Sequence, residues 1–77
     1  MMNNDIFNYI MSLLIDNAND VVEDVKKSPD NEYEKGRQLA YYEVLDTIRN
    51  ALDVYEYNLE ECGLKEDPMK MLYPKAT

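Results

Sequence analysis

The sequence contains a single cysteine, Cys62, and no histidine. An intramolecular disulfide is therefore excluded, and so is a zinc site built from cysteine and histidine. No histidine is present to activate the Cys62 thiol as a nucleophile. A chain of 77 residues forms a thin core and usually needs a disulfide, a metal or a second subunit. The sequence therefore favours association or very regular helix packing.

Basic residues are also few, at 8 against 16 acidic ones, which gives a formal net charge of −8. A surface this negative repels phosphates, so we expect no nucleic-acid partner and allow for a basic protein partner. The longest apolar stretch, IFNYIMSLLI, is about half the length that spans a bilayer, so no membrane partner is expected. The N-terminus lacks secretory-signal features, and a lone cysteine suits a reducing, cytoplasmic location.

With only two glycines and three prolines, the chain has few helix breakers. The pattern predicts a first helix over about 4–27, a turn at 28–30 and a second helix over about 31–62. Pro29 marks the turn, Asn31 is the expected N-cap, and Gly63 is the expected left-handed residue after the second helix. The C-terminal segment 64–77 contains Asp67-Pro68, which predicts one short third helix ending before Pro74.

Each long helix carries apolar residues at heptad spacing, in steps of four and three, which places them on one seam. The first seam is Phe7, Met11, Leu14, Ala18, Val21 and Val25. The second is Tyr41, Leu45, Ile48, Leu52, Tyr55, Leu59 and Cys62. The fold class is therefore all-α, as a single domain spanning 1–77 and built on an antiparallel helical hairpin.

The second predicted helix is longer than the first, so the end of its seam has no partner on the first helix. Either the C-terminal segment or another subunit must cover Tyr55, Leu59 and Cys62. The second helix also carries a strip of small or apolar residues, from Gly36 to Ala51, which lets another helix approach. A dimeric four-helix bundle could cover both this strip and the apolar seam. We therefore expect a homo-oligomer, with a dimer favoured. Its predicted interface is Gly36, Ala40, Tyr41, Val44, Ile48, Ala51, Leu52, Tyr55 and Leu59.

Two acidic pairs are the sharpest enzymatic signal. Asp20-x-x-Glu23 and Glu43-x-x-Asp46 could each present two carboxylates on one helix face and hold Mg²⁺ against a triphosphate. The arrangement resembles the E-x-x-E and E-x-x-D motif of the all-α nucleoside triphosphate pyrophosphohydrolases. It departs from that family at Asp20, and the four residues lie off the apolar seams. We therefore expect solvated carboxylates and a protein that is not an enzyme, with no catalytic residue, metal or cofactor.

The segment from Glu34 to Leu52, EKGRQLAYYEVLDTIRNAL, is similar to a family of small bacterial helical proteins of unknown function. That resemblance implies a shared scaffold and transfers no site residues. The function that we expect is a self-associating interaction module. The alternatives are an acidic, antitoxin-like inhibitor of a basic nucleic-acid-handling protein and a Mg²⁺-dependent pyrophosphohydrolase.

Overall fold

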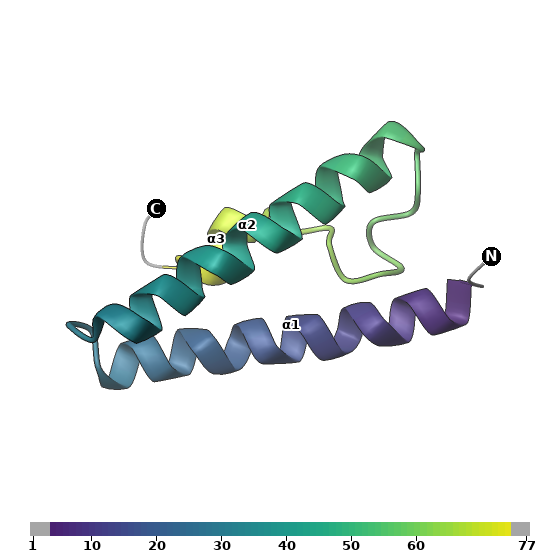
Figure 1. The fold of residues 1–77 in the computed structure, drawn as a ribbon. Helices are drawn as coiled ribbons and strands as arrows, with labels where there is room; N and C mark the ends of the chain where they lie inside the picture. Colours follow the sequence, from purple (N-terminus) through teal and green to yellow (C-terminus); the bar gives the residue numbers. More distant parts are fainter. Residues whose placement is uncertain (1–3, 75–77) are drawn as a thin grey trace.

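The computed structural model describes residues 4–74 and contains three helices over that range, with no strand. Helix α1 (Asn4–Lys27) and helix α2 (Glu32–Val54) form the antiparallel hairpin, and the short helix α3 (Pro68–Leu72) contacts both of them. Figure 1 shows the two long helices meeting at the turn and spreading apart toward the N-terminus of α1. The predicted all-α hairpin with a short third helix is confirmed. The end of the predicted C-terminal segment, residues 75–77, lies outside the described residues.

The turn between the long helices forms as the sequence predicts. Ser28 N donates to Asp24 O at 3.0 Å, and Asn31 N donates to Ser28 O at 3.0 Å. The Asn31 side chain accepts a hydrogen bond from Glu34 N at 3.0 Å, which satisfies one of the free N–H groups at the start of α2. The first predicted helix and the N-cap at Asn31 are thus confirmed.

The predicted length of the second helix is wrong, because α2 ends at Val54 and not at Cys62. Glu56 takes a left-handed conformation, with φ of 56°. Around it, Glu56 N donates to Asp53 O and Tyr57 N donates to Leu52 O, both at 3.0 Å. This pair of hydrogen bonds is the Schellman motif that ends many helices. The sequence places glutamate where the motif usually has glycine, so local signals did not reveal the end.

Tertiary packing explains why the chain turns there. Residues 55–67, which we call the strap, leave the end of α2 and run back between the two long helices (Figure 1). The Tyr57 ring packs edge-on against Phe7, with centroids 5.6 Å apart, and its hydroxyl donates to Asn8 Oδ1 at 2.9 Å. A straight continuation of α2 would carry these groups away from α1, so burial overrides local helix propensity.

Gly63 adopts the predicted left-handed conformation, with φ of 85°, but it ends a turn of the strap rather than α2. Leu64 N donates to Leu59 O at 2.8 Å and Gly63 N donates to Glu60 O at 3.2 Å, which forms a second Schellman motif. The turn brings Cys62 and Leu64 into the core. The strap therefore buries Cys62 and half-buries Leu59 within the chain itself, whereas Tyr55, at the start of the strap, stays exposed.

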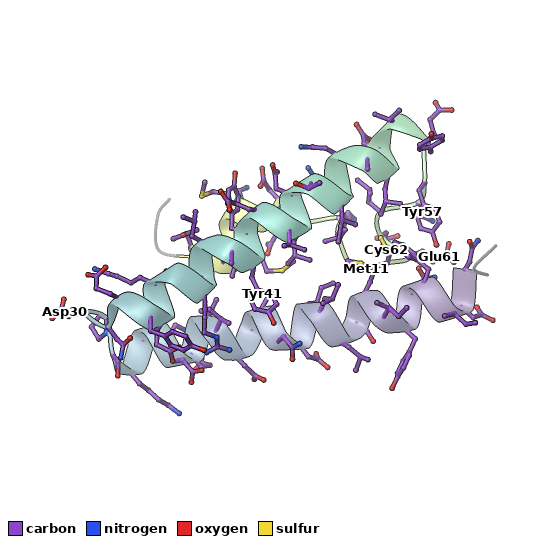
Figure 2. All side chains as sticks on the ribbon, in the orientation of Figure 1. Met11, Asp30, Tyr41, Tyr57, Glu61 and Cys62 are labelled. Carbon is purple, nitrogen blue, oxygen red and sulfur yellow. The ribbon has the colours of Figure 1, made fainter. Side chains whose placement is uncertain are left out.

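The core lies where α1, α2, the strap and α3 meet. Its buried residues are Met11, Ala18, Val21, Val22, Leu45, Cys62, Leu64, Pro68 and Leu72. Figure 2 shows Tyr41 pointing from α2 toward α1, and Cys62 close to Met11. Helix α3 begins as predicted, with Pro68 in its first turn and the Asp67 side chain accepting from Met69 N at 2.9 Å.

Candidate interaction surface

The strap and α3 cover only one side of the helical hairpin. Gln38 Nε2 donates to Leu72 O at 2.7 Å, and Arg49 Nε donates to Leu64 O at 2.9 Å. The second contact is extended by Arg49 Nη2, which donates to Lys65 O at 3.3 Å. Gln38 and Arg49 therefore mark the covered side of α2.

An ion pair marks a different side of the hairpin. Arg37 of α2 binds Asp24 of α1 at 3.1 Å and Glu34 at 2.9 Å. Because successive residues are rotated by about 100° on a helix, Arg37 lies about 100° around α2 from Gln38. The carboxylates raise the pKa of the Arg37 guanidinium, first through the hydrogen bond to Glu34 and then through that to Asp24. The pair thus joins the two long helices on a side different from the one that α3 contacts.

Apolar residues extend from this ion pair along both helices, and we call the resulting surface the open face. On α2, two steps of seven residues lead from Arg37 to Val44 and Ala51, and a step of four leads on to Tyr55. On α1, the positions that share the side of Asp24 include Leu13, Ile10 and Ile6. The open face is therefore built from the N-terminal half of α1 and most of α2.

The predicted interface residues divide into two groups. Those exposed on the surface are Gly36, Ala40, Val44, Ala51 and Tyr55. Those half-buried and packed against the core are Tyr41, Ile48, Leu52 and Leu59. The second group belongs largely to the chain's own packing, and Leu59 lies in the strap rather than on α2. The exposed group is the part of the prediction that remains available for contact with another molecule.

Large apolar side chains on the open face are well exposed. Val44 is 48% exposed and Tyr55 is 85% exposed on α2 and its C-cap, while Ile10 and Leu13 on α1 are 40% and 45% exposed. The contribution of α1 was missing from the predicted interface. The signal was present, because Ile6, Ile10 and Leu13 repeat in steps of four and three beside the first seam. These side chains are not covered by α2, because α2 diverges from this end of α1 (Figure 1).

The four carboxylates of the pyrophosphohydrolase-like pattern do not form a cluster. Glu23 pairs with Lys26 at 3.2 Å, and Asp46 accepts a hydrogen bond from Asn50 at 3.4 Å. Asp20 and Glu43 are exposed on their own helices. Within residues 4–74, no three His, Cys, Asp or Glu side chains are arranged to hold a metal ion. The structure therefore does not bring together the ligands that the sequence resemblance requires.

The Cys62 thiol is held in the core by the strap turn. It is 3% exposed, and its Sγ lies 3.5 Å from Leu59 O, to which the thiol donates. Burial raises the pKa of Cys62, which favours the neutral thiol over the reactive thiolate. Burial likewise raises the pKa of Tyr57. Both side chains thus act as packing groups of the strap.

The chain matches no family model, and it has no significant match among curated proteins or among solved structures. The resemblance to small bacterial helical proteins accordingly stays a prediction. None of the helices in the described range is both long enough and apolar enough to span a bilayer.

Proposed function

We propose that this protein is a self-associating interaction module that forms a homodimer through its open face. The observation that carries the proposal is the apolar surface on the uncovered side of the hairpin, which α1 and α2 build together. Burial of such side chains contributes roughly 1.5–3 kcal/mol each when they leave water completely. Two copies that meet through this face would complete a four-helix arrangement of two α1 and two α2 helices.

The shape of the single chain supports this proposal. The radius of gyration is 13.1 Å and the principal extents are 41, 23 and 15 Å. A compact domain of this length would have a radius of gyration of about 11.5 Å. The accessible surface is 5456 Å², whereas a compact monomer of the same mass would expose about 4,900 Å². The chain is thus more extended and more exposed than a compact monomer of its size, as a subunit that packs against a second copy would be.

The distribution of charge makes this face the least unfavourable one for contact between two copies. Self-association brings together two chains of net charge −8, so repulsion opposes it. The strip of small or apolar residues on α2 that begins at Gly36 continues through four uncharged positions: Ala40, Val44, Thr47 and Ala51. Contact along this strip therefore leaves the acidic side chains in water, and the small side chains permit close helix approach. Added salt should strengthen the dimer, since salt screens the remaining repulsion.

A pair of matched substitutions tests the proposal. Val44 lies on the open face and is 48% exposed, while Leu39 lies on another side of the same helix and is 49% exposed. The two positions are about 140° apart around the helix axis. Val44→Asp should convert the dimer to a monomer, because it places a charge within an apolar contact. Leu39→Asp should leave the dimer intact. Light scattering after size-exclusion chromatography reports both masses, and equal behaviour of the two variants would reject this face.

A second candidate function is the binding of a basic protein, as an acidic inhibitor would do. It is favoured by the ion-pair pattern, because the sequence contains sixteen acidic residues and the ion pairs within residues 4–74 engage five of them: Glu23, Asp24, Glu32, Glu34 and Glu60. The remaining carboxylates could steer a positive surface toward the protein. Salt distinguishes the two candidates, since it should weaken binding to a basic partner and strengthen the homodimer.

A further inference from the structure

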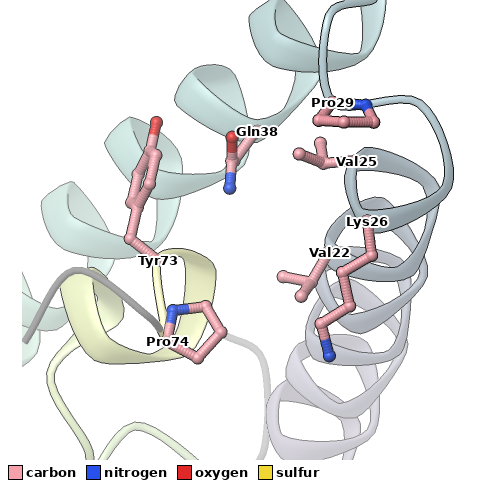
Figure 3. A pocket seen from close by; sticks show the side chains of 7 residues that line it. All are labelled: Val22, Val25, Lys26, Pro29, Gln38, Tyr73 and Pro74. Atoms are coloured by element: carbon pink, nitrogen blue, oxygen red, sulfur yellow. The ribbon is translucent and has the colours of Figure 1, made fainter.

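A cavity lies at the closed end of the hairpin, on a different side from the open face. It has a volume of about 550 Å³, within the range of about 300–1,000 Å³ that is usual for small-molecule sites. Its apolar lining comes from Val22 and Val25 of α1, Pro29 of the turn, and Tyr73 and Pro74 after α3. Figure 3 shows Val22 and Val25 directed from α1 into the space between the helices.

Two polar side chains, Lys26 and Gln38, complete the lining. Gln38 Nε2 already donates to Leu72 O at 2.7 Å, so this amide is engaged by the fold. Lys26 Nζ pairs with Glu23 at 3.2 Å, and their side chains are 50% and 62% exposed. Exposed pairs of this kind contribute little, so the ammonium group can exchange Glu23 for another anion.

The cavity lining carries little net charge, because its one ammonium group is paired with Glu23. Lys26 is the one charged residue in the cavity lining, although the chain carries a net charge of −8. The nearby carboxylate of Asp24 is held by Arg37 at 3.1 Å. Charges more than about 8 Å away are strongly screened at physiological salt, so the Lys26–Glu23 pair is the main charge at the cavity, and a ligand carboxylate would replace Glu23 on the ammonium.

We propose that this cavity binds a small aliphatic carboxylate, with its apolar chain against the valines and prolines and its carboxylate on Lys26 Nζ. The apolar walls supply most of the binding, and the single ammonium group selects an anionic head over a neutral or cationic one. A free fatty acid and the C-terminal carboxylate of an apolar peptide offer the same chemistry. The site is independent of the proposed dimer, because none of its lining residues belongs to the open face.

The test is a titration of the full-length protein, followed by NMR shifts at Val22 and Val25. The ligands are octanoate, octanol and octylamine, which share a chain length and differ in head group. Octanoate should bind with a dissociation constant on the order of a few millimolar, which is usual for a ligand of this size. Octylamine should bind most weakly. An apolar tetrapeptide, with a free or an amidated C-terminus, distinguishes a peptide source from a fatty-acid source.

Lys26→Gln should weaken octanoate binding about three- to fivefold and leave octanol binding unchanged. Lys27→Gln is the matched control, because Lys27 carries the same charge and does not line the cavity. It should change neither affinity by more than about twofold. The proposal is overturned if octanoate produces no shifts at about 10 mM, where a ligand of this size should bind. It is equally overturned if octylamine binds as tightly, or if the two lysine substitutions have equal effects.

Discussion

Replacing Gly63 by alanine should destabilise the protein, because two separate features of this position exclude a side chain. Its φ of 85° lies in the left-handed region, which L-residues rarely adopt. A Cβ atom built there would also lie 2.6 Å from Ile15 Cδ1 of α1. The strap turn that carries Gly63 holds Cys62 and Leu64 in the core, so strain at this turn acts on the packing of the whole fold.

The expected loss in the free energy of unfolding for Gly63→Ala is the balance of opposing contributions. The left-handed conformation costs roughly 1–2 kcal/mol for a residue with a Cβ atom. Alanine recovers about 0.4–1 kcal/mol, because it reduces the conformational freedom of the unfolded chain relative to glycine. The Ile15 methyl group must also move, although it is the end of a side chain and can shift. We therefore expect a net loss of about 1 kcal/mol, which corresponds to a fall of about 4–8 °C in melting temperature.

Thermal unfolding followed by circular dichroism measures the effect, and the chain's other glycine supplies the control. Gly36 lies inside α2, and a Cβ atom built there has nothing within 4 Å. Gly36→Ala should therefore raise the stability by up to about 1 kcal/mol, through helix propensity. Both variants should be measured at a low, matched protein concentration. If Gly63→Ala melts at or above the wild-type temperature, the strap turn does not constrain the fold in the way described.

Three further predictions concern the other turns and the buried thiol. Glu56→Gly should stabilise the protein by up to about 1 kcal/mol in urea unfolding, since glycine adopts the left-handed conformation at the end of α2 without strain; a loss of stability would contradict this. Asn31→Ala should cost about 1 kcal/mol in the same assay, because it removes the N-cap bond to Glu34 N, and no change would mean that the cap is unimportant. Burial raises the pKa of Cys62, so the folded state keeps a proton that the unfolded chain loses. The stability linked to this proton is therefore complete below the unfolded pKa of about 8.5 and falls as the pH rises above it. Cys62→Ala should flatten that decline, and an unchanged slope would contradict the assignment.

The hairpin was predictable from the sequence because its signals are local. Apolar spacing defined both seams, and Pro29 with Asn31 defined the turn between the helices. The Asp67-Pro68 pair likewise predicted α3. Each of these features depends on residues a few positions apart, which is the range over which capping and helix periodicity operate.

The end of α2 was not predictable, because contacts between distant residues determine it. Leu52, Tyr55 and Leu59 continue the heptad spacing past Val54, so the pattern alone extends the helix. The helix ends there because Tyr57 reaches Phe7 and Asn8, which lie about fifty positions earlier in the chain. Because these contacts end α2 at Val54, Leu59 lies in the strap and is half-buried. The same contacts therefore influence which of the predicted interface residues stay exposed.

Sedimentation equilibrium of the wild-type protein tests the proposed homodimer most directly. At concentrations on the order of 100 µM, the proposal predicts a mass approaching twice the 9.1 kDa of one chain. The association constant should increase between about 0.15 M and about 1 M salt, as the Debye length falls from about 8 Å to about 3 Å. A mass of 9.1 kDa at every concentration and at both salt levels would contradict the proposal that the open face is a self-association surface.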